Sequence, residues 1–596
     1  MALPWNLQRS RGRTPPINMH ATGRRGTAGE RRKNGARCRH GVALARISVG
    51  RPAFYESALV DAKFGLYQAA DFVISTGRVS NSPVLESALW YFRDETIALP
   101  RAGLPIADFT RGVSVEEDVV RWSRSHPPEA PLEYPPLVWV AAPEIVRSAR
   151  MSADGSRISS DAGSCVLSLM PKIALNRSYY NDASTGFLTQ RTLTLRGQSS
   201  EGRFIARTIW PDDFRLDRAA PERRIDATAL GLRSLVREVP RGGAQNPFAA
   251  MTLWERDAGA RNWSNKPVLG VVLNGAQGDD DEAHGGHFAL ITGRVGKDGA
   301  IGDWLTNNFY TLDSFSEKGI IAAMLPLDNY LGDLNSGQSW YRPSYLLVAV
   351  LRNERIAAYI QGALARVYNQ FYRHQLVYRH ATMNCASISV DVLRALKWNV
   401  RVRGPTGRLL AAASVPYVAL RERSAEKAVQ MYDYLSEDRT RLFPAVAFEE
   451  IGADLLSFAT AASERALTPF ETLLAADLEA LVFLRVPQLP SSRAWGDCPV
   501  VSTAEYHRRI PTDRSQQQII PVPARPFPEG LRPPDLLPPP RPRGEIALAI
   551  WAFLSIVGIP WLLWRWWRAH RGRRNVSMAQ AEEARATAIP RSADPK

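Results

Sequence analysis

The 596-residue sequence has only four cysteines: Cys38, Cys165, Cys385 and Cys498. Four widely separated cysteines are too few for a disulfide framework, and none has the Cys-X-X-Cys spacing of a zinc site. The sequence also lacks an internal repeat and a basic stripe interleaved with aromatic residues. We therefore expect no repeat fold, no nucleic-acid partner and no cofactor.

Acidic residues are scarce at the N-terminus. Residues 1–50 contain eleven Arg and Lys residues and a single acid, so they hold +10 of the formal net charge of +16. Low hydrophobicity and high charge predict a disordered basic arm over 1–50. That arm has no apolar run of the length that a secretory signal needs. The rest of the chain is nearly balanced in charge.

Apolar runs long enough to span a membrane are absent except at one place, 546–564. These 19 uncharged residues would form a helix of about 28 Å, close to the roughly 30 Å hydrocarbon core of a bilayer. Four tryptophans crowd the end of the run, as is typical of a membrane interface. The sequence therefore predicts one transmembrane helix whose partner is the lipid bilayer, preceded by a Pro-rich linker (510–545) and followed by a basic tail (565–596).

The orientation of this predicted helix depends on the flanking arginines. Five arginines follow the span and three precede it within twenty residues, which favours a cytoplasmic tail and an exported body. We expect a single-pass membrane protein with an exported body. Because no secretory signal is visible, the opposite orientation stays open.

The segments between the basic arm and the linker predict an α+β fold. Residues 51–135 read as a mixed, mostly helical segment, and 136–255 as a β-rich segment of short alternating runs. Four strands followed by two amphipathic helices are expected within 256–402. Residues 403–509 read as helices with little strand signal.

Within 256–402, three residues have the properties of a thiol site. Asn384 is a good helix N-cap, so Cys385 is expected at the first helical position, where the helix dipole lowers the pKa of a thiol. His287 follows two glycines at the start of a predicted strand and is the candidate base. Asn308, on the neighbouring predicted strand, could orient the imidazole.

The segments GGHFALITG, NNFYTLD and YRHATMNCASISVDVL resemble the Lnb-type N-terminal periplasmic domain. That family is similar to circularly permuted papain-like folds, including permuted NlpC-type hydrolases and lecithin–retinol acyltransferases. The resemblance implies a permuted papain-like thiol domain over 256–402. It implies Cys385 as nucleophile, His287 as base, Asn308 near the orienting position and Asn384 beside the nucleophile. It also implies acyl transfer or amide or ester hydrolysis at a bacterial envelope, on a lipid, lipoprotein or peptide substrate.

Two other functions remain open. A metal-dependent hydrolase could use His284 and His287 with the acidic run 279–282, although a glycine turn does not hold both imidazoles on one face. A non-enzymatic envelope scaffold could use the β-rich segment to bind a partner, with Cys385 as a buried apolar residue.

Overall fold

The computed structural model describes most of the chain body and a short C-terminal helix at 561–568. The described residues are 54–59, 63–75, 90–92, 95–101, 109–129, 137–170, 180–216, 219–238, 247–257, 262–275, 285–312, 320–334, 342–373, 375–490, 499–509 and 561–568. The predicted basic arm and linker lie outside these residues, as do most of the predicted transmembrane helix and of the basic tail. Over the part of the chain that is described, no helix has the length and apolar character needed to cross a membrane.

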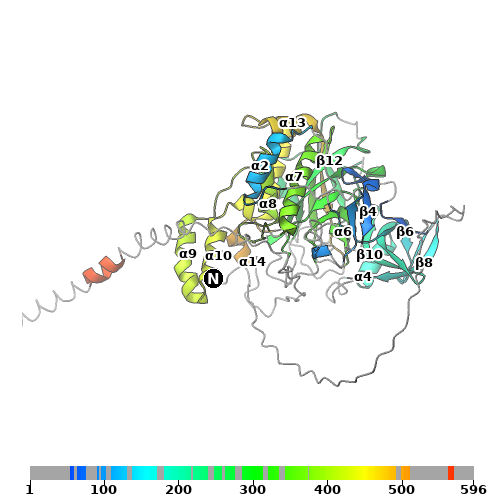
Figure 1. Cartoon of the computed structure of the whole chain (residues 1–596), viewed down its shortest axis with the longest axis horizontal. Coiled ribbons are helices and arrows are strands. Elements are labelled where there is room, and N and C mark those ends of the chain that lie inside the picture. The colour runs from blue at the N-terminus through cyan, green and yellow to red at the C-terminus, as the bar shows by residue number, and fades with distance from the viewer. Residues whose placement is uncertain are drawn as a thin grey trace, which may run out of the picture.

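The body has a mixed α+β fold, as the sequence predicts, and a seven-stranded sheet lies at its centre (Figure 1). All neighbouring strands in this sheet are antiparallel. In spatial order the strands are β11 (Ala249–Glu255), β17 (Leu478–Val486), β16 (Ser344–Leu351), β12 (Pro267–Asn274), β13 (His287–Arg294), β14 (Leu305–Asn307) and β15 (Met324–Pro326).

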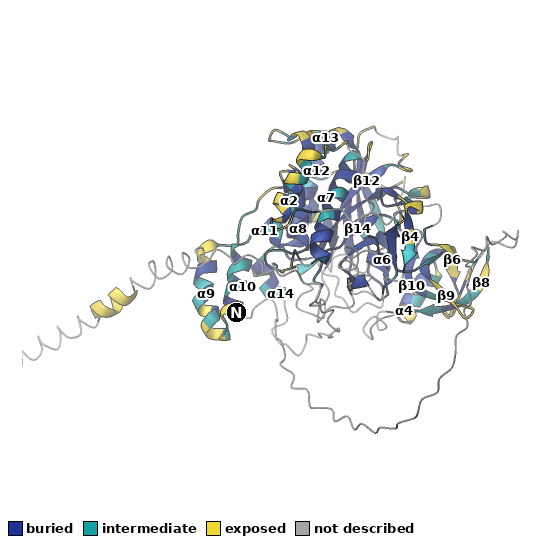
Figure 2. Cartoon of the chain, in the orientation of Figure 1, coloured by how far each residue is buried: buried dark blue, intermediate teal, exposed yellow. Residues whose placement is uncertain are grey.

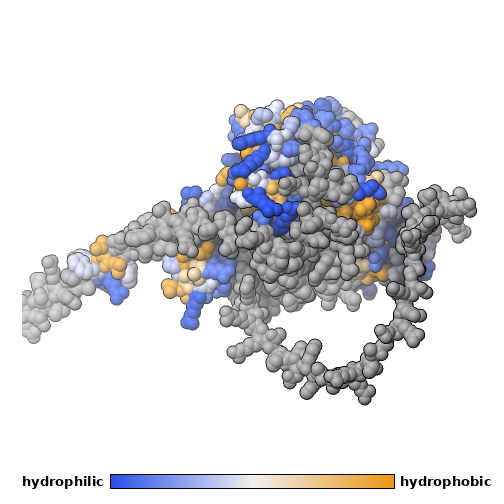
Figure 3. All heavy atoms as spheres, viewed as in Figure 1, coloured by the Kyte–Doolittle hydropathy of each residue, from blue (hydrophilic) through white to orange (hydrophobic). Residues whose placement is uncertain are grey.

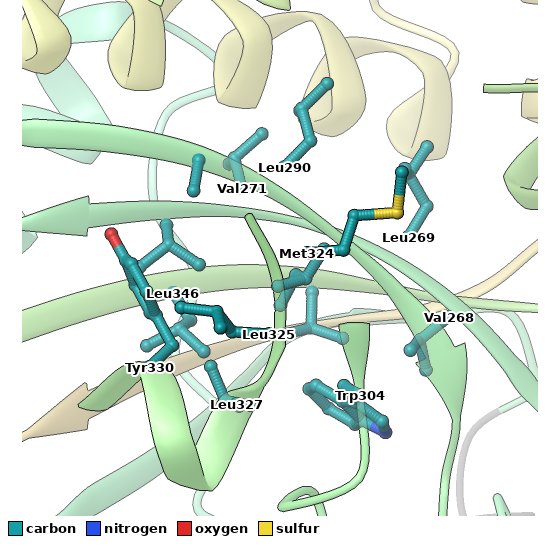
Figure 4. Packing of buried hydrophobic residues seen from close by; sticks show 14 of the residues in the cluster. Val268, Leu269, Val271, Leu290, Trp304, Met324, Leu325, Leu327, Tyr330 and Leu346 are labelled. Carbon is teal, nitrogen blue, oxygen red and sulfur yellow. The ribbon is translucent and has the colours of Figure 1, made fainter. Parts of the chain in front are cut away.

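The central strands are buried on both faces. Every residue of β12 and β16 is buried, and only the last residue of β13 is not (Figure 2). This burial explains why their sequences are continuous apolar runs rather than alternating ones. Close packing also fixes Gly293, because a Cβ there would lie 2.6 Å from the ring of Trp304. Figure 4 shows this part of the core, where Trp304, Met324 and Tyr330 pack against the strands.

Helices from several parts of the chain pack on this sheet, and α8 and α12 both contact β13. Helices α2 and α7 are joined through the buried carboxylate of Asp118, which accepts from Arg366 at 2.7 Å and from Gln370 at 3.1 Å. Helices α7 (Arg355–Tyr372), α8 (Cys385–Ala395) and α12 (Pro444–Thr460) contact the sheet directly. Helices α2 (Val115–Ser125), α5 (Ala229–Val236) and α13 (Pro469–Asp477) pack on these three helices.

The β-rich segment closes into a ring of strands rather than forming an open sheet. Strand β6 pairs with β7 on one side and with β9 on the other, and β9 pairs with β10, which in turn pairs with β8. A helix, α4 (Asp182–Thr189), packs on β6. The strands are β6 (Glu144–Met151), β7 (Arg157–Ser160), β8 (Gly163–Leu169), β9 (Leu193–Ser200) and β10 (Arg203–Pro211), with β1 (Glu56–Ser57) added at β6.

A buried ion-pair cluster joins this ring to the central sheet. Arg196 on β9 donates to Asp328 at 2.7 Å and to Asp303, and Arg196 and Asp328 are almost fully buried. Asp328 lies in the short helix α6 (Leu327–Gly332), which follows β15 directly. The ring and the sheet also share one continuous hydrophobic core.

The predicted segment boundaries do not match the units of the structure. The region 403–509 contains the predicted helices α9 (Arg408–Glu422), α10 (Ala425–Ser436), α11 (Arg439–Leu442) and α14 (Thr503–Arg509), but also strand β17 inside the central sheet. Strand β11, from the predicted β-rich segment, forms the edge of the same sheet. The sheet thus takes strands from both sides of 256–402, since β17 pairs with the free edge of β16 and β11 pairs with β17.

The described part of 51–135, predicted to be mostly helical, contains several short strands besides helix (β1 among them). In its described part only α2 is a longer helix. The other strands are β2 (Lys63–Phe64), β3 (Tyr67–Gln68), β4 (Phe72–Ser75) and β5 (Ile97–Pro100). An isolated bridge from Ala98 to Val138, and another from Val138 to Met324, connect this segment to the edge of the central sheet. Non-local pairing therefore decides its structure.

Candidate functional site

Helix α8 begins at Cys385, as the Asn384 signal predicts. The Asn384 side chain accepts from the backbone N–H of Ala386 at 2.9 Å and of Ser387 at 2.8 Å. The Ser387 hydroxyl accepts in return from the Asn384 N–H at 2.7 Å, which completes a capping box. Asn384 also donates to the carbonyls of His380 and Leu442. The cap therefore fixes both the start of α8 and the loop before it.

The sulfur of Cys385 is surrounded by hydrogen-bond donors. The backbone N–H groups of Phe288, Ala386 and Cys385 and the hydroxyl of Tyr378 lie near the sulfur and act to lower its pKa. The Cys385 N–H itself donates to the Tyr378 hydroxyl at 3.4 Å. Phe288 is the second residue of β13, directly after His287. The first turn of α8 and the beginning of the histidine strand therefore meet at the sulfur.

Burial nevertheless raises the pKa of the Cys385 thiol above its ordinary value, against the N–H groups and Tyr378, which lower it. The expectation that the helix N-terminus would lower this pKa is therefore wrong for the described structure. Cys385 is only 4% exposed, and the cost of removing a thiolate from water exceeds the help from the local donors. The resting sulfur is a neutral thiol at neutral pH.

His287 is buried at the first position of β13, opposite Asn274 on β12. Gly286 before it has a φ of +71°, and a Cβ there would lie 2.6 Å from Pro499 and 2.8 Å from the Asn274 carbonyl. The glycine is thus required for close packing and a left-handed backbone, rather than for substrate access.

The imidazole of His287 is neutral at physiological pH. Burial, followed by the positive charge of Arg342, lowers the pKa of His287 to about 3, while the Asn308 side chain acts in the opposite direction. A neutral imidazole can accept a proton, which is the state that a general base requires. The buried pair is therefore a neutral thiol and a neutral imidazole.

Asn308, the predicted orienting residue, lies near this imidazole. It follows β14, the strand that pairs with β13, and its amide nitrogen donates to the Ile321 carbonyl at 2.7 Å. Its amide oxygen and His287 Nε2 are both buried, and by strict geometry neither completes a hydrogen bond with any residue in the described ranges. The Asn308 side chain lies near enough to His287 to raise its pKa, against the larger effects of burial and Arg342.

Polar and aromatic side chains that the sequence analysis missed enclose the pair. The rings of Tyr310 and Tyr330 lie 5.9 and 6.3 Å from the His287 ring. Tyr310 also lies 5.4 Å from Tyr378, whose ring is 5.2 Å from that of His380. Tyr310, Tyr378 and His380 fall within the segments quoted for the resemblance, so their proximity to His287 and Cys385 in sequence was the available signal.

Tyr330 and Asn274 lie next to His287 and are linked by a hydrogen bond. The Tyr330 hydroxyl donates to the Asn274 amide oxygen, and Asn274 donates to the Ser344 hydroxyl at 2.8 Å. Burial raises the pKa of Tyr330 well above its ordinary value, the Cys385 sulfur adds to the effect and Arg342 opposes it. Tyr330 thus lies close enough to sense both Cys385 and Arg342, although α6, α8 and β16 come from distant parts of the sequence.

The metal hypothesis finds no support in the described residues. His284 and the acidic run 279–282 lie outside them, and the described His, Cys, Asp and Glu residues form no group of three or more arranged to hold a metal ion. His287 is instead surrounded by Asn308, Tyr310 and Tyr330.

No family model, no curated protein and no solved structure matches this chain. The geometry and chemistry of the site are therefore the basis for its function.

Proposed function

We propose that this chain is a membrane-anchored thiol enzyme of the bacterial envelope, which performs acyl transfer or amide or ester hydrolysis through Cys385 and His287. The observation that carries the proposal is the packing of α8 on β13, which brings the Phe288 N–H near enough to the Cys385 sulfur to lower its pKa. It brings the capped cysteine helix to the strand that begins with His287. The same order, a histidine strand before a cysteine helix, supports the resemblance to permuted papain-like and Lnb-type domains.

The proposed reaction begins with a proton transfer. As the Cys385 sulfur attacks the acyl carbon, its proton passes to His287, and the new S–C bond makes a tetrahedral intermediate. Protonated His287 carries an additional N–H donor. The buried amide oxygen of Asn308, which accepts no hydrogen bond from the described residues, can accept from it. Asn308 is therefore a positioning residue that stabilises the imidazolium.

The intermediate then collapses to a thioester on Cys385. The C–N or C–O bond of the substrate breaks, and the leaving amine or alcohol takes the proton from His287. An acceptor amine or a water molecule next attacks the thioester, gives its proton to His287 and releases the thiol.

The membrane anchor in this proposal is the apolar run 546–564. Its length, its lack of charge and the arginines that follow it support a single transmembrane helix. The body would then be periplasmic on the inner membrane, with the basic tail in the cytoplasm.

The test of function compares purified full-length variants on p-nitrophenyl esters and on acylated peptides. Cys385→Ser should nearly abolish turnover, because a serine hydroxyl in this place does not ionise. His287→Ala should reduce kcat by about 100- to 10,000-fold, and Asn308→Ala by less. Cys165→Ser is the matched control, since Cys165 lies on β8 in the strand ring. Equal activity in Cys385→Ser and the control would refute the thiol mechanism.

The burial of Cys385 and the raised pKa of its thiol favour one second candidate, a non-enzymatic envelope scaffold in which the thiol is a core residue. The same variants and substrates separate the enzyme from the scaffold, because a scaffold would show no turnover even in the wild type.

A further inference from the structure

Helix α9 has two apolar faces, and only one of them is covered. Ala411, Val415 and Val418 pack against Ala428, Met431 and Leu435 of α10, which gives the α9–α10 hairpin a small core of its own. On the opposite side Leu409 is 76% exposed, Leu410 52%, Tyr417 50% and Leu420 81%. The hydrophobic spheres over α9 are visible in Figure 3.

The exposed residues form one continuous stripe. Leu409, Leu410, Tyr417 and Leu420 fall within one sector of about 100° around the helix axis, and the half-buried residues 413 and 416 lie on the same side. A surface helix of a water-soluble body normally places charged residues there. The outward face of α9 is therefore built to contact another apolar phase.

Arginines flank this stripe. Arg408 precedes it, and Arg421 and Arg423 follow it, all exposed. The Arg421 guanidinium donates to the Tyr417 hydroxyl at 3.0 Å and lies 5.9 Å from the centre of the Tyr417 ring. An apolar stripe flanked by Arg, with an aromatic ring beside a guanidinium, is the pattern of a helix that lies at an anionic membrane interface.

The position of the hairpin connects it with the predicted anchor. Tyr434 of α10 packs against the cluster that contains Tyr506 of α14. Helix α14 ends at Arg509, and the chain continues from there into the predicted Pro-rich linker and the apolar run 546–564. In Figure 1, α9, α10 and α14 lie together at the opposite end of the body from the strand ring. The α9–α10 hairpin thus lies beside α14, the last described helix before the predicted tether.

We propose that the exposed face of α9 lies on the lipid bilayer that holds the anchor, with Leu409, Tyr417 and Leu420 in the interface and the flanking arginines at anionic headgroups. The inference rests on the membrane anchor of the proposed function. At about 3.1 Å per residue, the predicted linker 510–545 spans roughly 110 Å when extended, which is long enough for the hairpin to reach the surface that holds the anchor. Docking would fix the orientation of the body on the membrane.

The test places a photocrosslinking residue on α9 in the full-length chain. Leu420→benzoylphenylalanine is reconstituted in vesicles of phosphatidylethanolamine and tritiated phosphatidylglycerol, and Glu201→benzoylphenylalanine, exposed in the strand ring, is the control. Irradiation should attach labelled lipid at position 420 and at least about tenfold less at position 201. A crosslinked dimer in place of the lipid adduct would show that a second copy covers α9, and would overturn the proposal, as would equal labelling at the two positions.

A second variant measures the contribution of the stripe. With benzoylphenylalanine at Tyr417, the additional change Leu420→Ser should reduce lipid labelling several-fold, while Leu420→Met should preserve it. Carbonate extraction of the same vesicles distinguishes a failure of the α9 docking from a failure of the membrane anchor. A chain that resists extraction but gives no adduct on α9 refutes the docking alone, whereas a chain that is extracted refutes the anchor.

Discussion

The backbone N–H of Phe288 lies near enough to the sulfur of Cys385 to lower its pKa, although the two residues are almost a hundred positions apart in the sequence. This contact joins the first residues of β13 to the first turn of α8, and it places His287 at the same end of the sheet as the thiol. The neutral states of the two side chains follow from their shared burial.

The burial of His287 predicts a specific loss of stability in acid. The pKa of His287 is about 3 when folded and close to 6.5 when unfolded. Between these values the unfolded chain binds a proton that the folded chain does not. The free energy of unfolding should therefore fall as the pH drops from about 6.5 towards 3, by at most roughly 1.4 kcal/mol per pH unit from this group.

Urea unfolding of the wild type and of His287→Gln at pH 7.5, 6 and 5 measures this contribution. The variant should lose less stability between pH 7.5 and pH 5 than the wild type does. Parallel curves for the two proteins would mean that the imidazole is protonated in the folded state.

The Asn384 cap predicts a graded loss of stability. Asn384→Ala removes the two bonds to the first turn of α8 and the two bonds donated to His380 and Leu442. The cap alone is worth about 0.5–2 kcal/mol, and the two donated bonds add to that. Asn384→Ser keeps a capping oxygen and loses only the donated bonds, so its free energy of unfolding should lie between those of the wild type and the alanine variant. Equal values for the two variants would contradict the capping role.

The ion-pair cluster of Arg196 predicts a large and pH-dependent cost. Arg196→Met leaves Asp328 buried without its cation, a change that typically costs about 3–5 kcal/mol. Burial already raises the pKa of Asp328 to about 6, with Arg196 opposing the rise. Without Arg196 that pKa should rise further, and the folded carboxyl would bind a proton more readily than the unfolded one. The variant should therefore lose more stability at pH 7.5 than at pH 5, measured by urea unfolding. A cost that is the same at both pH values would contradict this account.

Local signals predicted the elements of the site, but not what surrounds them. Asn384 and the apolar runs of β12, β13 and β16 specify a cap and three buried strands within short windows. Strand β17 follows α13 without a break, and a continuous apolar run does not distinguish a buried strand from a helix. Tyr330 and Arg342 reach the site only through tertiary packing, so no spacing in the sequence could connect them with Cys385.

The same limit explains the thiol. Its position at a helix N-terminus is a local property that the sequence shows, whereas the burial that raises its pKa depends on residues from β13, α6 and the loop before α8. The ring of β6 to β10 is closed by the pairing of β6 with β9, across more than forty residues of the chain. Alternation within each strand predicts a half-buried surface, but not which partner covers it.

The most direct test of the central claim is to trap the acyl intermediate. The full-length protein would be mixed with p-nitrophenyl butyrate, quenched in acid within seconds, digested and examined by mass spectrometry. We predict a butyryl adduct on the peptide that contains Cys385, removed by neutral hydroxylamine as a thioester should be, and strongly reduced in His287→Ala. An unmodified Cys385 under conditions in which the ester is consumed, or an adduct that forms equally without His287, would contradict the thiol mechanism.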